Sequence, residues 1–335
     1  MIYHILLAFV ATFILTCILG QLGIPVLKSL HAQQRLREEG PESHQAKAGT
    51  PTMGGAFMMI ALTLGVAIFA PWNVATGMIL FLTLGHCLLG FFDDFVKAVK
   101  KRNLGLTATQ KLLGQFILAA IFCYCLTEIM VIPTTLWIPV VDTYVDLGIA
   151  YYVLTFLVIV ATSNAVNLTD GLDGLASGTS AIAAIAFSVI GLMFSSSTNA
   201  MAAESIAYFG AMVTAVCLGF LVFNTNPAKV FLGDTGSLPL GVAFAGMAIL
   251  TKTELLLVII GGIFVMEALS VVIQVISFKT RGVRVFKMSP IHHHFELLGW
   301  SEQTVVNRFW FGGAVLAILG VSYCLHVNVI IFGVV

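Results

Sequence analysis

Two adjacent carboxylates stand where an apolar stretch of the chain ends, in residues 91–95 (Phe-Phe-Asp-Asp-Phe). Acidic side chains at the edge of a membrane span are costly to place, and such residues usually serve a function. On a helix Asp93 shares a face with Lys97, whereas Asp94 points about 100° away. The pair is therefore a catalytic candidate. The alternative is a simple ion pair at a helix end.

A second polar motif places an amide or a carboxylate at every third position: Asn164, Asn167, Asp170 and Asp173. On a continuing helix they would form one slowly drifting stripe, while the glycines at 171 and 174 favour a helix end and the close approach of a ligand. These side chains could hydrogen-bond a base or a sugar, or bind a metal. The alternative is a polar seam between two helices.

A third motif spans residues 223–237 and includes Asn224, Phe231, Gly233 and Asp234. Asp234 precedes an apolar segment, in the position expected of a helix N-cap. Glycines on both sides of it suit the approach of phosphate oxygens to backbone N–H groups at a helix N-terminus. An ordinary cap would explain Asp234 alone but not the rest of the motif.

Three consecutive histidines, His292, His293 and His294, lie near the end of a late polar segment. Zinc ligands are usually spaced by two to five residues, so this run does not favour a zinc site. Contacts with a pyrophosphate or a sugar suit the run better.

A Gly- and Thr-rich turn at residues 47–55 contains Lys47 and Thr52. By itself such a turn is a weak signal, and an ordinary connection is an equally good interpretation.

Taken together, five aspartates belong to these motifs, and lysines, amides and histidines accompany them. Mg²⁺ is commonly held by one or two carboxylates together with phosphate oxygens. Carboxylates with a basic rim at the edge of a membrane therefore predict metal-assisted phosphoryl transfer.

The elements that must position these residues are membrane helices, because 59% of the 335 residues are hydrophobic and only 10% are charged. A soluble domain has about 25% charged residues, and a helix needs about 20 apolar residues to cross a bilayer. We predict an all-α integral membrane protein with a single domain over residues 1–335. The ten predicted spans lie near residues 2–27, 53–70, 75–95, 112–132, 148–166, 176–194, 202–223, 238–252, 255–278 and 309–333.

Charge predicts the orientation of these spans. Ten spans place both termini on one side, and every lysine and arginine except Lys252 then falls on the other side. The positive-inside rule makes the basic side cytoplasmic. All five polar motifs lie there, so the sequence predicts a multi-pass membrane protein with extracytoplasmic termini and a cytoplasmic active site.

The motifs at residues 92–95, 164–174, 231–237 and 288–296 resemble those of the polyprenyl-phosphate N-acetylhexosamine-1-phosphate transferases. The turn at 47–55 and the three histidines are similar to the phospho-N-acetylmuramoyl-pentapeptide transferase branch of that family. The resemblance covers essentially the whole chain.

The resemblance implies that UDP-N-acetylmuramoyl-pentapeptide and undecaprenyl phosphate give lipid I and UMP, the first membrane step of peptidoglycan synthesis. It also implies Mg²⁺, a homodimer in the bacterial cytoplasmic (inner) membrane and no nucleic-acid partner. Two alternatives are a sister transferase that moves GlcNAc-1-phosphate and an ion-coupled transporter. A transporter would place its ionisable groups near mid-membrane, whereas here they gather at one face.

The same resemblance implies roles for single residues. Asp234 would bind Mg²⁺, and Asp93 would position or deprotonate the lipid phosphate with Asp94 beside it. Whether an Asp becomes phosphorylated or the lipid phosphate attacks directly stays open. Phe231 would stack on uracil. The other residues implied for catalysis or for binding the nucleotide and sugar are Lys47, Thr52, Asn164, Asn167, Leu168, Asp170, Asp173, Asn224, Gly233, His292 and His293.

Overall fold

Long apolar helices make up most of the computed structural model, which describes residues 1–30, 49–100, 104–195 and 200–332, with side chains to residue 326. The first half contains α1 (Ile2–Ser29), α2 (Gly55–Phe69), α3 (Val74–Val99), α4 (Ala108–Tyr124) with the π-helical turn Cys125–Ile129, and α5 (Ile149–Thr169). The second half contains α6 (Leu175–Phe194), α7 (Ala200–Asn224), α8 (Asp234–Leu250), α9 (Glu254–Ile260), α10 (Gly262–Arg281), α11 (Ile291–Glu296) and α12 (Glu302–Phe332).

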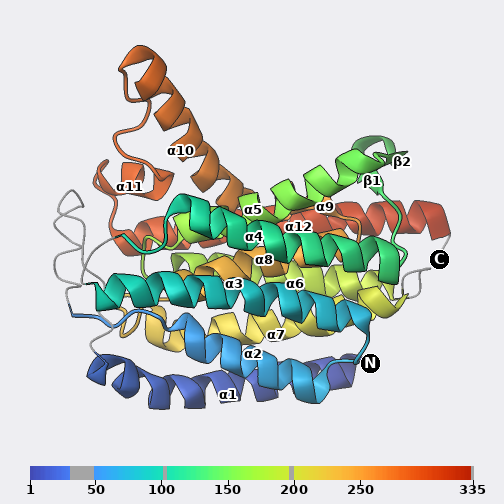
Figure 1. Ribbon diagram of the computed structural model, residues 1–335, viewed down its shortest axis with the longest axis horizontal. Helices are drawn as coiled ribbons and strands as arrows, with labels where there is room; N and C mark the ends of the chain where they lie inside the picture. The colour runs from blue at the N-terminus through green and yellow to red at the C-terminus, as the bar shows by residue number, and fades with distance from the viewer. Residues whose placement is uncertain (31–48, 101–103, 196–199, 333–335) are drawn as a thin grey trace.

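The helices run side by side along the long axis of the molecule (Figure 1). Helix α1 begins and α12 ends at the same end of this bundle, and α11 lies at the other end. Strands β1 (Thr135–Ile138) and β2 (Thr143–Asp146) form a small antiparallel hairpin joined by a 3₁₀ turn. The hairpin lies at the end of the bundle where α1 begins and α12 ends. The prediction of an essentially all-α protein is confirmed, apart from this hairpin.

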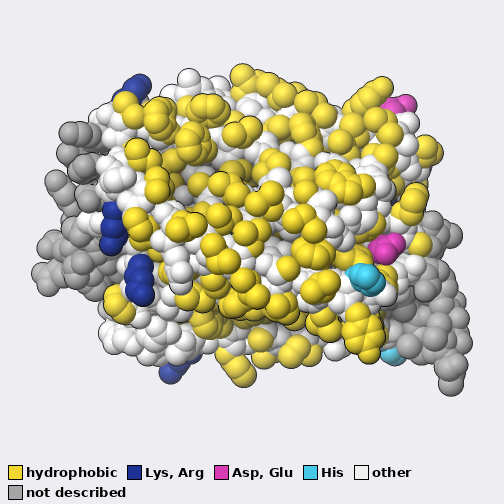
Figure 2. Space-filling model, turned by 90° about the horizontal axis from the view of Figure 1, so that it is seen from below, with side chains coloured by type: hydrophobic (Ala, Val, Ile, Leu, Met, Phe, Trp, Pro, Cys, Tyr) yellow, Lys and Arg dark blue, Asp and Glu magenta, His cyan; other side chains and the backbone are white. Residues whose placement is uncertain are grey.

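Eight helices of the described chain are long and apolar enough to cross a membrane, and two shorter apolar helices, α2 and α8, accompany them. The side of the molecule seen in Figure 2 is covered by hydrophobic side chains, and its lysines and arginines gather at one end. This surface fits a protein whose middle faces lipid, because charges avoid the hydrocarbon region.

Helix α8 is the centre of the bundle, and all its residues are buried. It packs mainly against α3 and α5. Glycine permits these contacts, because a Cβ on Gly90 of α3 would overlap the Asp234 carbonyl and a Cβ on Gly55 of α2 would overlap the Gly236 backbone. Small residues allow membrane helices to approach closely, and here they bring α2 and α3 onto the first turn of α8.

The predicted span at residues 255–278 is divided at Gly261 into the short α9 and the longer α10. Gly261 and Gly262 stand together at the break, and glycine is a poor helix former. Helix α9 packs on α12, whereas α10 leans away from the bundle toward α11 (Figure 1).

Candidate active site

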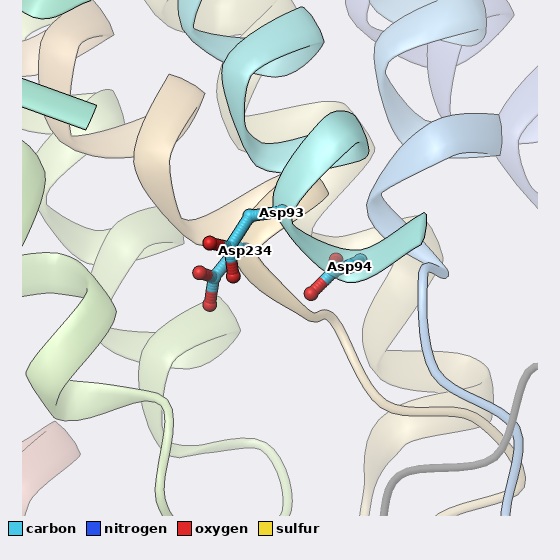
Figure 3. A group of neighbouring side chains, drawn as sticks. All are labelled: Asp93, Asp94 and Asp234. Carbon is cyan, nitrogen blue, oxygen red and sulfur yellow. The ribbon is translucent and has the colours of Figure 1, made fainter. Parts of the chain in front are cut away.

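Three aspartates from two helices meet at the end of the bundle that carries α11 (Figures 1 and 3). Asp93 and Asp94 lie in the last turns of α3, and Asp234 is the first residue of α8. One carboxylate oxygen from each can be chosen so that all three lie within 4.8 Å of one another. Their exposed fractions are only 0%, 4% and 9%, so the fold concentrates negative charge in a largely desolvated place.

Asp94 has a different environment from Asp93 and Asp234. Its Oδ2 accepts hydrogen bonds from the backbone N–H of Thr235 at 2.9 Å and from the Thr235 hydroxyl at 2.7 Å. Asp94 therefore accepts a hydrogen bond from the Thr235 N–H in the first turn of α8, as the side chain of an N-cap residue normally does.

The sequence predicted that Asp234 itself would be the N-cap, and this is wrong by one residue. Gly233 is the N-cap and Asp234 begins the helix. Because Asp94 from another helix supplies the capping contact, the Asp234 carboxylate is free to face Asp93 (Figure 3).

Two lysines bridge these carboxylates. Lys97 Nζ lies 2.6 Å from Asp93 Oδ2 and 3.1 Å from Asp234 Oδ2, and Lys111 Nζ lies 3.0 Å from Asp93 Oδ1 and 2.7 Å from Asp234 Oδ2. Three carboxylates and two ammonium groups give a formal net charge of −1 (−3 + 2) when all are ionised. Helical spacing predicts Lys97 on the face of Asp93, but no pattern in the sequence assigns Lys97 or Lys111 to the site.

The loop before α4 also reaches this centre. The backbone N–H of Leu106 donates to Asp93 Oδ1 at 2.8 Å, and Gly105 packs so closely on the carboxylate that a Cβ there would overlap it. A Thr107–Gln110 capping box starts α4 and thereby orients Lys111 one turn later. This box was a local signal that could have drawn attention to Lys111.

The polar stripe at the end of α5 is divided by the fold. Asn167 belongs to the centre, because its amide donates to Asp234 Oδ1 and to Ser237 Oγ, both at 2.8 Å. Asn164 instead is exposed and donates to the Val160 carbonyl one turn back at 2.8 Å. Helix α5 ends at Thr169, just before Gly171, so the predicted helix end is confirmed and Asp170 and Asp173 lie beyond the helix.

Asp170 follows α5 and is half-buried near the three aspartates. Burial and the neighbouring Asp234 and Asp94 carboxylates raise the pKa of Asp170 to about 8, although the Gly233 N–H opposes the shift. A cation among these acids would reverse the shift, because it favours the charged form.

Two of the predicted binding residues hold loops together. Asn224 Oδ1 accepts from Gly174 N–H at 3.1 Å and from Ser177 Oγ at 2.8 Å, and its amide donates to the Val230 carbonyl at 3.0 Å. Asp173 Oδ2 accepts from the Asn226 amide at 3.2 Å and from Ala228 N–H at 3.0 Å. These contacts join the α5–α6 loop to the α7–α8 loop.

Residues 51–55 pair with the segment before α8. Phe231 N–H donates to the Pro51 carbonyl at 2.8 Å, and Gly54 N–H donates to the Phe231 carbonyl at 2.9 Å. Thr52 is buried, and Gly233 has a left-handed φ of 72° beside it. Phe231 and Leu168 are half-buried, and Lys47 lies outside the described residues.

The three histidines have three different partners. The fully buried His292 contacts Glu267 of α10, with Nδ1 3.1 Å from both carboxylate oxygens. His293 Nδ1 lies 2.8 Å from Glu296, and His294 Nδ1 accepts from Lys287 N–H at 3.1 Å. Glu267 falls within the predicted span at residues 255–278, and its role was missed because a contact between α10 and α11 leaves no local pattern.

The donor set at this centre fits a divalent cation. Carboxylate oxygens are the ligands that Mg²⁺ prefers, and it usually takes one or two of them together with phosphate oxygens. Asp93 and Asp234 offer such oxygens side by side, and Lys97 and Lys111 supply positive charge for an anionic substrate. A buried centre of this composition can bind and transfer a phosphoryl group.

Comparison with known proteins identifies the family. The model of glycosyl transferase family 4 matches residues 76–252, slightly more than half of the chain, and the chain belongs to this family. It is 52% identical to the phospho-N-acetylmuramoyl-pentapeptide-transferases of Bacillus pumilus and Bacillus subtilis, over 95% of this chain and 97% of theirs. It is 54% identical to that of Anoxybacillus flavithermus, over 92% of this chain and 94% of that protein. Its branch of the family is thus that of the phospho-N-acetylmuramoyl-pentapeptide-transferases.

Proposed function

We propose that this protein transfers phospho-N-acetylmuramoyl-pentapeptide from UDP-N-acetylmuramoyl-pentapeptide to undecaprenyl phosphate, giving lipid I and UMP. The observation that carries the proposal is the buried cluster of Asp93, Asp94 and Asp234 with two lysines, in a chain similar to transferases of that name over almost its whole length.

In this reaction an oxygen of the lipid phosphate attacks the β-phosphorus of the nucleotide. The bond from that phosphorus to the oxygen bridging the α- and β-phosphates breaks, and UMP leaves with that oxygen. Such transfers depend on positioning and on the stabilisation of negative charge. Lys97 and Lys111 each lie within 3.1 Å of Asp234 Oδ2 and can place an ammonium group beside the phosphates.

Asp234 would hold Mg²⁺, which supplies charge neutralisation at the phosphate oxygens. Asp93, at the end of a membrane helix, is the group best placed to position or deprotonate the lipid phosphate. Asp94 would act through α8, since it caps the helix that begins with Asp234.

The nucleotide would bind where the loop after α5 meets the segments around Thr52 and Phe231. Phe231 would stack on uracil, and Asp170 and Leu168 would line the same pocket. The remaining residues assigned to the nucleotide or the sugar are Lys47, Asn164, Asn167, Gly233, His292 and His293, and Asn224 and Asp173 would support their loops.

The orientation in the membrane is inferred from the end of the bundle that carries α11. Eight long helices together with α2 and α8 would make ten crossings, and basic residues gather at the end that carries α11. The positive-inside rule then supports a cytoplasmic site in the bacterial cytoplasmic membrane, with both termini outside. The protein would act there as a homodimer.

The test is Mg²⁺-dependent release of UMP by the purified protein in detergent, with undecaprenyl phosphate and each UDP-sugar supplied in turn. UDP-N-acetylmuramoyl-pentapeptide is expected to support turnover, and UDP-GlcNAc is not. Release of UMP only with UDP-GlcNAc would replace this proposal by the sister transferase.

A further inference from the structure

Glu267 is a buried acid to which the proposed function gives no task. It lies on α10, a helix of membrane-spanning length, and its exposed fraction is 0%. A carboxylate inside a membrane helix is costly and usually pairs with another polar or ionisable group. The partner here is His292, which is also fully buried and lies on the short α11.

The geometry of the pair determines which ring nitrogen carries a proton. Nδ1 of His292 lies 3.1 Å from each carboxylate oxygen of Glu267. An ionised carboxylate can only accept hydrogen bonds, so Nδ1 is the donor. A neutral His292 ring then carries its lone pair on Nε2, because the hydrogen bond made by one nitrogen sets the state of the other.

Nε2 of His292 is buried and has no hydrogen-bond partner among the described residues. It lies against Gly171, where a Cβ would overlap it. Gly171 is next to Asp170, whose pKa responds to Asp234 and Asp94. The free nitrogen therefore faces the loop that borders the aspartate cluster.

On the Glu267 side, burial and hydrogen bonds connect α10 to the loop before α11. Ile263, Phe264, Glu267 and Ser270 are the buried residues of α10. Beyond them Gln274 accepts from the N–H groups of Val285 and Phe286 at 3.0 and 2.9 Å, which folds the loop before α11 back onto α10. Helix α11 thus meets α10 at a defined place.

We propose that Glu267 is a positioning residue that holds His292 as the Nδ1-protonated tautomer, with Nε2 presented to the substrate side of the α5–α6 loop. The inference rests on the proposed function, since it gives His292 a partner within that site. Nε2 would accept a hydrogen bond from a hydroxyl or amide N–H group of the sugar part of the nucleotide sugar. Outer partners of this kind commonly affect activity by about 10–100-fold when they are removed.

The test compares Glu267→Gln, Glu267→Asp, His292→Gln and the double variant Glu267→Gln/His292→Gln in full-length protein. Glu267→Gln is expected to lower kcat about 10–100-fold while KM for the nucleotide sugar changes less than about twofold. Glu267→Asp, which keeps the carboxylate, should recover part of the loss. The double variant should be no slower than His292→Gln, because Glu267 acts through His292.

A spectroscopic measurement separates positioning from general stability. In ¹⁵N-histidine-labelled protein without substrate, the signals lost in His292→Gln should be those of an Nδ1-protonated ring, and Glu267→Gln should move them toward the other tautomer. The matched control is Glu254→Gln, another buried acid with a hydrogen-bonded partner, Tyr151 at 2.6 Å. It should leave kcat and the His292 signals unchanged.

An unchanged tautomer in Glu267→Gln overturns the inference, and so does a kcat within twofold of wild type or a fully multiplicative double variant. Failure of the proposed function looks different. In that case wild-type protein releases no UMP from any UDP-sugar. The labelled protein without substrate still shows whether the tautomer of His292 depends on Glu267.

Discussion

Two buried clusters of lysine and acid lie in different parts of this protein, and they are built differently. At the aspartate cluster, Lys97 and Lys111 contact three carboxylates, so negative charge is in excess. At the second cluster, in the turn between α8 and α9, Lys252 donates to the Pro133 carbonyl at 2.6 Å, the Thr135 carbonyl at 3.1 Å and the Tyr151 hydroxyl at 2.7 Å.

The difference shows how to separate a site from a structural network. An ammonium group has three N–H donors, and Lys252 uses all of them on groups that the fold itself provides. It thereby fastens the segment before and within β1 to α5 and to the α8–α9 turn. The aspartate cluster instead has three carboxylates against two ammonium groups, and a bound metal ion could balance the remaining negative charge. Four predictions test this contrast.

The largest effect is expected for Asp234→Asn, which keeps the side-chain volume but removes the charge. Turnover should fall by about 10³-fold or more, because a metal contributes several kcal/mol to the transition state. Melting in detergent should stay close to wild type. The matched change at the second cluster is Glu254→Gln, because Glu254 accepts a hydrogen bond from Tyr151, a partner of Lys252. This change should leave turnover unchanged. Near-normal turnover of Asp234→Asn at saturating Mg²⁺ would contradict the difference between the two clusters.

Lys97→Met should have the next largest effect, lowering turnover while raising the affinity for Mg²⁺. Turnover should fall by about 10²-fold, the scale for loss of one group that stabilises developing charge. The affinity for Mg²⁺ should rise, because the carboxylates lose an internal counter-ion that lies 2.6 Å from Asp93. Thermal shift against Mg²⁺ concentration measures the second effect, and a weaker affinity would show that Lys97 does not compete with the metal.

Phe231→Ala and Asp93→Asn would divide the site into nucleotide and lipid halves. Phe231→Ala should weaken UDP-sugar binding by about 1–3 kcal/mol, the scale of base–aromatic stacking, with little change in the apparent affinity for polyprenyl phosphate. Asp93→Asn should lower turnover while nucleotide binding stays near wild type in a titration without lipid. Equal loss of nucleotide binding in both variants would contradict the division.

Lys252→Met should change stability and leave turnover alone. Burial lowers the pKa of Lys252 from 10.5 to about 8, so between these values the unfolded chain binds more protons than the folded protein. Stability from this group therefore rises as the pH rises from about 8 to 10.5. The melting temperature of wild type relative to Lys252→Met, followed over that range, should rise. A flat difference would show that Lys252 titrates normally.

Much of this protein was determined by local sequence. Apolar runs of membrane-spanning length predicted the long helices, because only a helix satisfies its own backbone in lipid. The clusters around Asp93, Asp170 and Asp234 were visible because acids are rare at the edge of a membrane span, and the structure brings these residues to one end of the bundle. That the motifs belong to one centre followed from the alternation of loops between two sides.

Only the tertiary structure decided which of these side chains contact one another. Lys111 meets Asp234 although 123 positions separate them, and no local pattern encodes such a contact. The capping of α8 by Asp94, the use of Asn224 and Asp173 to join loops and the pairing of Glu267 with His292 depend in the same way on helices that meet only after packing. The length of the apolar runs records which segments are helices. The glycine contacts at Gly55 and Gly90, together with the break at Gly261, determine which side chains those helices bring together.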